Sequence, residues 1–409
     1  MQAAQIRCTG QVSVSLARRR YIDGTRRWVP ESGSATDDRG EFRIFGVPPG
    51  EYVIIAMFNA TELGLRDRVR YVPTCYPGTP EASGAQRVTV GPGQEVPGIT
   101  IALARAATAT VRGVVRASGQ ASFGPFTFVS AREISAPQAD GRAETAIAAG
   151  DGSFAIAGLL PGAYIVEGRS LSGSEFASVE VVVDGSDVVG VTLMLSKGAT
   201  ARGRISFDTG QPPPGLRPSQ VLVLPTLADH QMTEMGGGPP VTHDDWTFEL
   251  KGLRGRAFIR AGTLSDWQMK RVRREGVDVT DTPLDFATDV DGLDIELTQR
   301  LTTVSGGVSD DRGGVALDAT VIAFADDPGK WGPHSRFIES ARPDQQGRFT
   351  IQGLPPGRYV AIAVGYLEPG EERDPDVLKA WREGGTPFTL SEGETQALDL
   401  KLSAFQALR

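Results

Sequence analysis

The chain has 409 residues, with 50 acidic and 42 basic side chains and a formal net charge of −8. This negative balance argues against nucleic acid or an anionic membrane surface as a partner, because both attract an excess of basic side chains. Apolar residues make up 40% of the chain, and its 50 glycines and 27 prolines indicate an all-β protein with many tight turns.

The start of the chain carries no visible export signal. Residues 1–8 lack the charged segment followed by an apolar stretch that marks a signal peptide. No apolar run reaches the roughly 18 residues needed to cross a bilayer, so we expect no transmembrane segment. The first strand-like run, residues 10–16, has the character of a later strand of a domain. We therefore expect a clipped start, a hidden export signal and a periplasmic, cell-surface or secreted location.

Four copies of one strand-like motif, Phe-x-(Ile/Leu)-x-Gly, recur along the chain, and each follows an acidic turn. They begin at Phe42, Phe154, Phe248 and Phe349, with spacings of 112, 94 and 101 residues. Such spacings are too long for a solenoid repeat and suit one small β-sandwich per copy. We predict four β-sandwich domains, named here the first to fourth repeat, over residues 1–106, 107–197, 198–299 and 300–409.

Alternating apolar residues predict strands at both ends of these repeats. The last three repeats begin with glycine-containing strands, at residues 111–116, 201–207 and 304–308. All four end with strands of the same period, at residues 99–103, 191–195, 293–297 and 398–402. No Pro-rich or Gly/Ser-rich spacer separates the repeats, so we expect neighbouring domains to abut and to move little relative to each other.

One short helix is predicted in the fourth repeat, near residues 374–383. Asp374 and Pro375 suit its N-terminal end. The apolar stripe that follows consists of Val377, Leu378 and Trp381. We expect this helix to cover a sheet edge or an open end of the sandwich.

The residues of each motif copy have separate structural tasks. In the first copy, Phe42 and Ile44 are expected to face the core, and Gly46 to bend the chain. Pro49 and Gly50 suit the central positions of a type II turn. The third copy differs, with Trp246 in place of the first glycine, Arg254-Gly255 in place of Pro-Gly, and Phe258 in place of tyrosine. We expect its turn to be the least rigid.

The motif resembles the carboxypeptidase regulatory-like modules, which are prealbumin-like (transthyretin-like) sandwiches of the carbohydrate-binding-like fold. The resemblance rests on the pattern Phe-x-Ile-x-Gly-Leu-Pro-Pro-Gly-x-Tyr, as at residues 349–359, and extends over all four repeats. It implies a tandem array of four prealbumin-like, Greek-key β-sandwiches, and an extracellular bacterial protein with an adhesive or spacer role. The matching residues build turns and core, so the resemblance implies no catalytic site.

Catalytic and metal-binding signatures are missing from the sequence. Three residues separate His230 from Glu234, whereas a zinc peptidase needs a His-x-x-Glu pair, and the chain has only three histidines. We therefore expect no enzyme activity, no cofactor and no transition-metal site. Cys8 and Cys75 allow either one disulfide or two unpaired thiols.

Acidic residues recur before each motif copy, and they have two interpretations. Carboxylates are ligands for calcium, but each cluster supplies few of them, so turn formation is the better interpretation. The residues concerned are Asp37, Asp38, Asp151, Asp244, Asp245 and Asp344.

Trp331 and Trp28 are the candidate sugar-contact residues. Trp331 lies in a loop-like Asp-Pro-Gly context and Trp28 follows two arginines, although both also suit packing at a core edge. We predict a non-catalytic exported or cell-surface scaffold or interaction protein, whose partners are other proteins or cell-surface glycans. The alternative is a carbohydrate-binding protein that uses loop-borne tryptophans.

Overall fold

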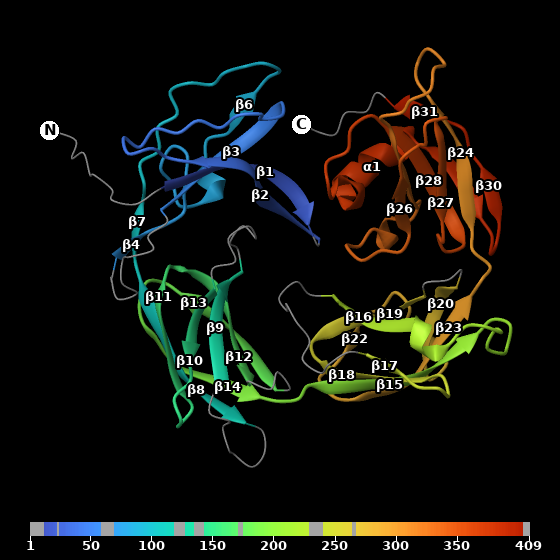
Figure 1. Ribbon diagram of the computed structural model, residues 1–409, viewed down its shortest axis with the longest axis horizontal. Coiled ribbons are helices and arrows are strands. Elements are labelled where there is room, and N and C mark those ends of the chain that lie inside the picture. Colours follow the sequence, from blue (N-terminus) through green and yellow to red (C-terminus); the bar gives the residue numbers. More distant parts are fainter. Residues whose placement is uncertain are drawn as a thin grey trace. The chain divides into compact units, whose positions relative to one another are not determined.

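The computed structural model describes residues 12–22, 24–58, 69–117, 127–134, 143–170, 175–228, 240–263 and 267–403. Most of these residues lie in strands, which confirms the all-β prediction (Figure 1). The chain divides into two compact units: residues 1–20 with 26–196, and residues 21–25 with 197–409. No helix of the described part is long and apolar enough to cross a membrane.

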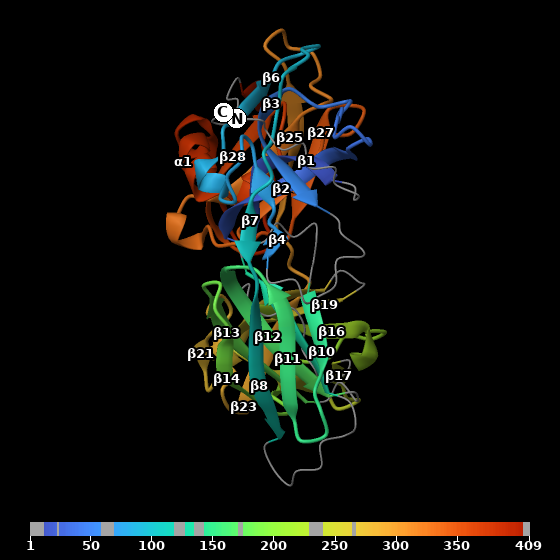
Figure 2. The same cartoon turned by 90° about the vertical axis from the view of Figure 1, so that its left-hand side faces the viewer.

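The second repeat shows the sandwich in its simplest form; Figure 1 labels all of its strands, and Figure 2 shows them from the side. Its strands are β8 (Ala109–Ala117), β9 (Thr127–Glu133), β10 (Ala143–Ile147), β11 (Ser153–Leu159), β12 (Gly162–Ser170), β13 (Phe176–Val183) and β14 (Val188–Leu195). One sheet has the order β11-β8-β14 and the other the order β10-β9-β12-β13. The first strand β8 lies between β11, antiparallel to it, and the last strand β14, parallel to it. This is a Greek-key sandwich.

The third repeat keeps this strand order, and its two sheets are joined along one edge. Its strands are β15 (Ala199–Phe207), β16 (Val221–Leu227), β17 (Val241–Thr242), β18 (Thr247–Leu253), β19 (Arg256–Thr263), β20 (Gln268–Arg274), β21 (Val277–Asp278), β22 (Leu284–Asp285) and β23 (Val290–Thr298). The first strand β15 again lies between β18 and the last strand β23. Pairing of β20 with β23 joins the two layers into one bent sheet.

The fourth repeat places its first strand in the same position. Its strands are β24 (Thr303–Ser309), β25 (Thr320–Ala325), β26 (Ile338–Ala341), β27 (Arg348–Gln352), β28 (Gly357–Val364), β29 (Thr386–Leu390), β30 (Thr395–Ala397) and β31 (Leu400–Ser403). β24 pairs with β27 on one side and with β30 and β31 on the other.

The first repeat lacks that first strand within the described residues. Its strands are β1 (Val12–Ile22), β2 (Thr25–Ala35), β3 (Gly50–Phe58), β4 (Val69–Tyr71), β5 (Thr74–Cys75) and β6 (Val88–Val90), and β7 (Arg105–Ala107) pairs with β4. β1 pairs with β3 as β9 pairs with β12, so β1 corresponds to the second strand of the other repeats. The segments around Phe42 and Ile101, which flank the first strand elsewhere, form no described strand.

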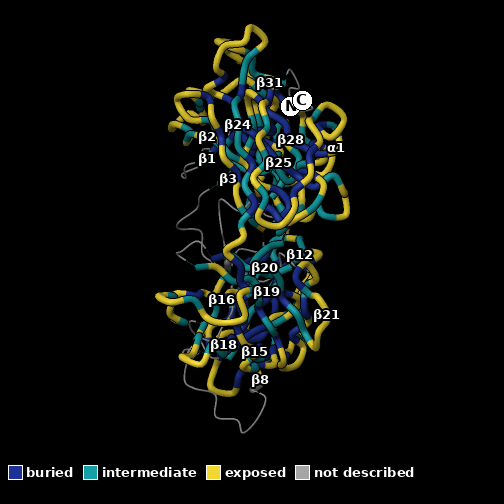
Figure 3. The backbone as a smooth tube through the Cα atoms, turned by 90° about the vertical axis from the view of Figure 1, so that its right-hand side faces the viewer, coloured by how far each residue is buried: buried dark blue, intermediate teal, exposed yellow. Residues whose placement is uncertain are grey.

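Each repeat has its own hydrophobic cluster. Phe154, Phe248 and Phe349 are buried in three different clusters, drawn from residues 109–195, 199–297 and 304–400. Phe42 packs against a fourth cluster, around Tyr52. Figure 3 shows the buried backbone positions of the third and fourth repeats in dark blue. These separate cores support the proposed division into four repeats.

Gly46 and its counterparts in the other copies bend the chain, as predicted, but the predicted turn at Pro49–Gly50 does not form. Gly46, Gly158, Gly252 and Gly353, which end the Phe-x-(Ile/Leu)-x-Gly segments, all have φ between 65° and 81°. The type II turn at Pro49–Gly50 is wrong: Gly50 has φ 158°, far from the value near 80° that this turn requires, and it begins β3.

The third copy departs from the motif in two ways. Trp246 takes the first glycine's position with φ 65°, an uncommon value for a residue with a side chain. Phe258 has the sequence position of the tyrosine, as predicted, but it does not take the tyrosine's place in the core, because the inward and outward positions of its strand are exchanged. Ala257 and Ile259 face the core instead, and the ring of Phe258 points outward.

Helix α1 (Pro375–Gly384) is confirmed, including its cap: Asp374 accepts a hydrogen bond from the N–H of Asp376 at 3.0 Å. Its buried residues, Val377, Leu378 and Trp381, pack on Ile322, Phe324, Ile338, Val360, Ile362 and Val364. These partners lie on the outer face of the β25–β28 sheet (Figure 1), so the helix covers a sheet face and not an edge. Both faces of this sheet are therefore buried.

A glycine at the centre of the first strand allows close packing in three repeats. Gly113, Gly203 and Gly306 stand opposite Phe154, Phe248 and Phe349 in the register. A Cβ atom on these glycines would come within 2.1, 2.2 and 2.0 Å of the carbonyl oxygens of Val191 in β14, of Leu293 in β23 and of Leu398 between β30 and β31. Only glycine fits there without a shift of the backbone.

We predict that Gly203→Ala lowers the free energy of unfolding of the third repeat by about 1–3 kcal/mol, because the added methyl group overlaps the backbone of Leu293. Gly262→Ala is the matched control in the same repeat, since no atom lies within 4 Å of the position that its added methyl group would take. The measurement is unfolding in urea, in which hydrogen exchange of peptide fragments from the third repeat reports how much of that repeat is unfolded. Equal stability of the two variants would contradict the packing argument.

Candidate functional site

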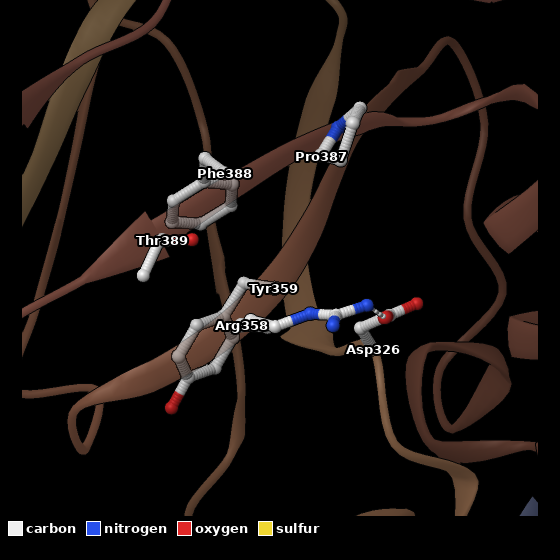
Figure 4. Close-up of a pocket in the computed structure, with 6 residues that line it drawn as sticks. All are labelled: Asp326, Arg358, Tyr359, Pro387, Phe388 and Thr389. Atoms are coloured by element: carbon white, nitrogen blue, oxygen red, sulfur yellow. Dashed lines mark hydrogen bonds and ion pairs between the residues drawn. The ribbon is translucent and has the colours of Figure 1, made fainter.

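A shallow pocket of about 160 Å³ lies on the fourth repeat (Figure 4). Asp326, Arg358, Tyr359, Pro387, Phe388 and Thr389 line it. The rings of Tyr359 and Phe388 stack with their centroids 5.6 Å apart and form its apolar wall. Adjacent strands β28 and β29 supply five of these residues, so the pocket is part of a rigid sheet surface.

The carboxylate of this pocket is fully engaged in ion pairs. Asp326 accepts hydrogen bonds at 2.7 Å from Arg382 of α1 and from Arg358. These two guanidinium groups, Arg382 first, hold the pKa of Asp326 below its usual value. A carboxylate kept ionised and paired is a poor general acid or base, so the arrangement favours a structural role for this group.

The recurrent aspartates act as turn residues. Asp37 accepts from the backbone N–H of Arg39 and Glu41, and Asp344 accepts from those of Gln346 and Arg348. Asp151 and Asp245 bind the residue two positions on in the same way. The pKa of each of these four carboxyl groups is lowered by hydrogen bonds to the turn. Each of these carboxylates bonds to its own turn, which favours the structural interpretation over calcium.

Metal-binding groups are not gathered in the part of the chain that the structure describes, where no cluster of three or more His, Cys, Asp or Glu residues occurs. Cys75 is a free, buried thiol, and its burial raises its pKa. Cys8 and His230 lie outside the described residues.

Trp331 does not offer a ring face to a sugar. Its side chain is 6% exposed, its indole N–H donates to the carbonyl of Ala325 at 2.6 Å, and its ring packs edge-on against Phe324. The loop-like sequence context concealed this, because Pro328–Lys330 forms a short 3-10 turn that directs Trp331 inward. Its placement therefore does not support the predicted sugar contact.

Trp28 has a more open environment. It lies on β2, an edge strand of its sheet, and is half-buried against a cluster that contains Val53 and Ile55. Trp28 belongs to the first repeat and Trp331 to the fourth.

A network of ion pairs and hydrogen bonds joins the third and fourth repeats. Arg336 donates to both carboxylate oxygens of Asp281, at 2.9 and 3.0 Å, and to the carbonyl of Lys270 at 3.2 Å. Glu392 binds Lys270 at 2.6 Å and Arg300 at 3.0 Å. Bidentate arginine–carboxylate pairs fix orientation as well as distance.

Phe258 also belongs to this contact, and its outward ring lies 6.1 Å from that of His334 in the fourth repeat. The altered third copy of the motif thus places an aromatic ring at the boundary with the next repeat. Sequence reasoning missed the contact, because it joins residues far apart in the chain that carry no local pattern. Only the unusual turn of the third copy signalled that this repeat differs.

No protein-family model matches the chain, and no curated protein is similar to it in sequence. Solved structures that match part of the backbone include two pilins and the Bacillus anthracis TIE protein, all with low TM-scores. The Streptococcal ancillary pilin is 12% identical, with a TM-score of 0.23 over 73% of this chain and all of the pilin. The major pilin SpaD from Corynebacterium diphtheriae is 11% identical, with a TM-score of 0.20 over 73% of this chain and 98% of SpaD. The Bacillus anthracis TIE protein is 10% identical, with a TM-score of 0.18 over 96% of this chain and 68% of that protein.

Likenesses of this size carry no functional argument, so the class of protein is defined by the structure itself. The chain is an all-β, multidomain sandwich protein.

We predict that Arg336→Ala loosens the third repeat from the fourth, because it removes the bidentate bond to Asp281. The distribution of distances between spin labels at positions 244 and 311, attached through unnatural amino acids, is expected to become broader, as for domains joined without a firm interface. Arg348→Ala is the control, since this exposed arginine pairs with Asp344 in its own turn. An unchanged distribution in Arg336→Ala would show that other contacts fix the two repeats.

Proposed function

We propose that the chain is a non-catalytic scaffold or interaction protein of the bacterial cell exterior, built of carboxypeptidase regulatory-like modules. The observation that carries this proposal is the bidentate contact of Arg336 with Asp281, made directly between two sandwiches without a spacer. Such contacts maintain fixed spacing along a row of domains, which is what a scaffold requires.

The side-chain chemistry supports the same proposal. The pocket carboxylate Asp326 is neutralised by two arginines, and the motif aspartates are consumed by their own turns. In the described residues these groups have structural partners and do not converge on one apolar-walled cleft, which is the arrangement expected of an active site. We infer that the partners are other proteins or cell-surface glycans, bound through strand edges and exposed loops.

The location is tested by protease treatment of intact cells that express the chain in its native context. We expect added proteinase K to degrade the chain while a cytoplasmic marker survives, because the proposed scaffold faces the exterior. Protection of the chain until the cells are lysed would overturn the proposed location.

A carbohydrate-binding function is the second candidate, and Trp28 favours it because its ring is only half-buried on an outer strand. Stacking of a sugar on this ring predicts that Trp28→Ala abolishes any glycan-array signal while the fold is kept. Trp331→Ala is unsuitable for this purpose, because loss of a buried tryptophan costs about 3–5 kcal/mol. Trp28→Phe is the matched variant, since it keeps an aromatic face and is expected to retain part of the signal. A signal unaffected by Trp28→Ala would reject this site.

A further inference from the structure

The outer face of one sheet of the second repeat carries two arginines without an acidic partner in the part of the chain that the structure describes. Arg112 and Arg116 lie on β8, the middle strand of the sheet β11-β8-β14 (Figure 1). Val111 and Val115 of the same strand face the core, so both arginines face outward, and both are exposed. We call the outward side of this sheet the arginine face.

The same face of the third repeat surrounds its arginine with acids. Arg202 has the position of Arg112, because each lies one residue before the glycine that stands opposite the motif phenylalanine. Its guanidinium group lies 3.1 Å from Glu249, 3.2 Å from Asp289 and 3.3 Å from Asp291. The third repeat therefore supplies carboxylates from β18 on one side and from the beginning of β23 on the other.

On one side of β8, an alanine stands where the third repeat has an acid. Ala155 of β11 is the register partner of Arg112. The corresponding partner of Arg202 is Glu249. Ala155 is exposed, and β11 contains no acidic residue, so this strand offers no carboxylate to the guanidinium group.

On the other side of β8, the outward residues of β14 are uncharged. Val189 and Met194 are 71% and 52% exposed. Thr192 lies between them on the same face, since Leu193 and Leu195 belong to the core. This strand therefore adds exposed apolar surface beside the arginines and no carboxylate.

The remaining acids of the repeat do not neutralise the face. Asp187, just before β14, accepts the backbone N–H of Thr110 at 2.9 Å. Residues 118–126 and 171–174 lie outside the described part and contain no acidic residue, and residues 135–142 contain one acid and one arginine. These segments together bring no net negative charge to the arginine face.

The spacing of the arginines defines the charge pattern of a partner. Arg112 and Arg116 are four residues apart on one strand, which separates their Cα atoms by about 13 Å. Two acids four residues apart in an extended segment have the same separation. The residue midway between these acids would meet Val114, which lies between the arginines on the same face. The matching pattern is acid-x-apolar-x-acid.

The apolar residues of the face favour a protein over an acidic glycan. Sugar rings are commonly bound by stacking on aromatic side chains, and β8, β11 and β14 turn no aromatic ring outward. Val114, Val189 and Met194 are aliphatic or thioether side chains, which suit contact with apolar side chains. Covering them would remove apolar surface from water.

We propose that the arginine face of the second repeat binds an extended, acidic segment of another protein with the pattern acid-x-apolar-x-acid. The two arginines bind its carboxylates by charge-assisted hydrogen bonds, as Arg202 binds Glu249 within the third repeat. This inference rests on the proposed interaction function, for which it names a class of partner. Peptide binding and exposure at the cell exterior are measured separately, so the failure of one is distinguishable from the failure of the other.

The test uses the full chain and a fluorescent peptide with the sequence Ser-Glu-Thr-Val-Thr-Glu-Ser. We expect saturable binding by fluorescence anisotropy at low salt, and binding about tenfold weaker at about 0.5 M salt, because salt screens exposed ion pairs. The same peptide with both glutamates changed to glutamine is expected to bind at least about tenfold more weakly.

Ala155→Glu is the matched variant in the protein, because it offers Arg112 a carboxylate from its own sheet, as in the third repeat. We expect it to weaken binding of the peptide by about fivefold, and Arg112→Ala to have a similar effect. Arg348→Ala is the control, since it removes an exposed arginine of the fourth repeat, and it should leave binding unchanged.

Three results would overturn the proposal. Equal binding of the glutamate and glutamine peptides would show that the arginines do not recognise carboxylates. Tighter binding of an oligogalacturonate than of the peptide would make an acidic glycan the occupant of the face. A dimer of the chain in sedimentation that Arg112→Ala dissociates would make a second copy the occupant.

Discussion

Each complete repeat depends on one close contact, in which a glycine of the first strand lies opposite a phenylalanine and against a carbonyl of the last strand. The three residues come from the two ends and the middle of the repeat, for example Gly203, Leu293 and Phe248. A side chain at the glycine would separate the strands, and the sheet could not bring the termini of the repeat together. The same contact fixes the register, so the alternating apolar residues of all three strands face one core.

Many polar side chains of the described residues have structural roles in this architecture. Four motif aspartates satisfy backbone N–H groups in the turns that lead each phenylalanine strand into the sheet. Between the third and fourth repeats, Arg336 and Glu392 use their charges to hold two sandwiches together. Charged groups bound in this way have fixed positions, which suits a structural role better than proton transfer.

Much of the fold could be predicted from the sequence because its determinants are local. Period-two alternation, the acidic turns and the helix cap of Asp374 act over a few residues, and each is visible in the printed chain. The orientations of the Trp331 and Phe258 side chains were not predictable, because each depends on the conformation of the preceding turn, which the sequence does not fix. The contact of Arg336 with Asp281 joins two loops 55 residues apart and has no sequence pattern at all.

The first repeat departs from this arrangement in the residues that the structure describes. Its segments 41–45 and 99–103 form no strand there, and their apolar residues are half-buried against the cluster around Tyr52. Arg43 and Glu95 reach toward each other across the position that a backbone N–H and a carboxylate share in the second and third repeats. An ion pair between side chains that are 69% and 82% exposed contributes little in water, so this pair adds little to the stability of the repeat.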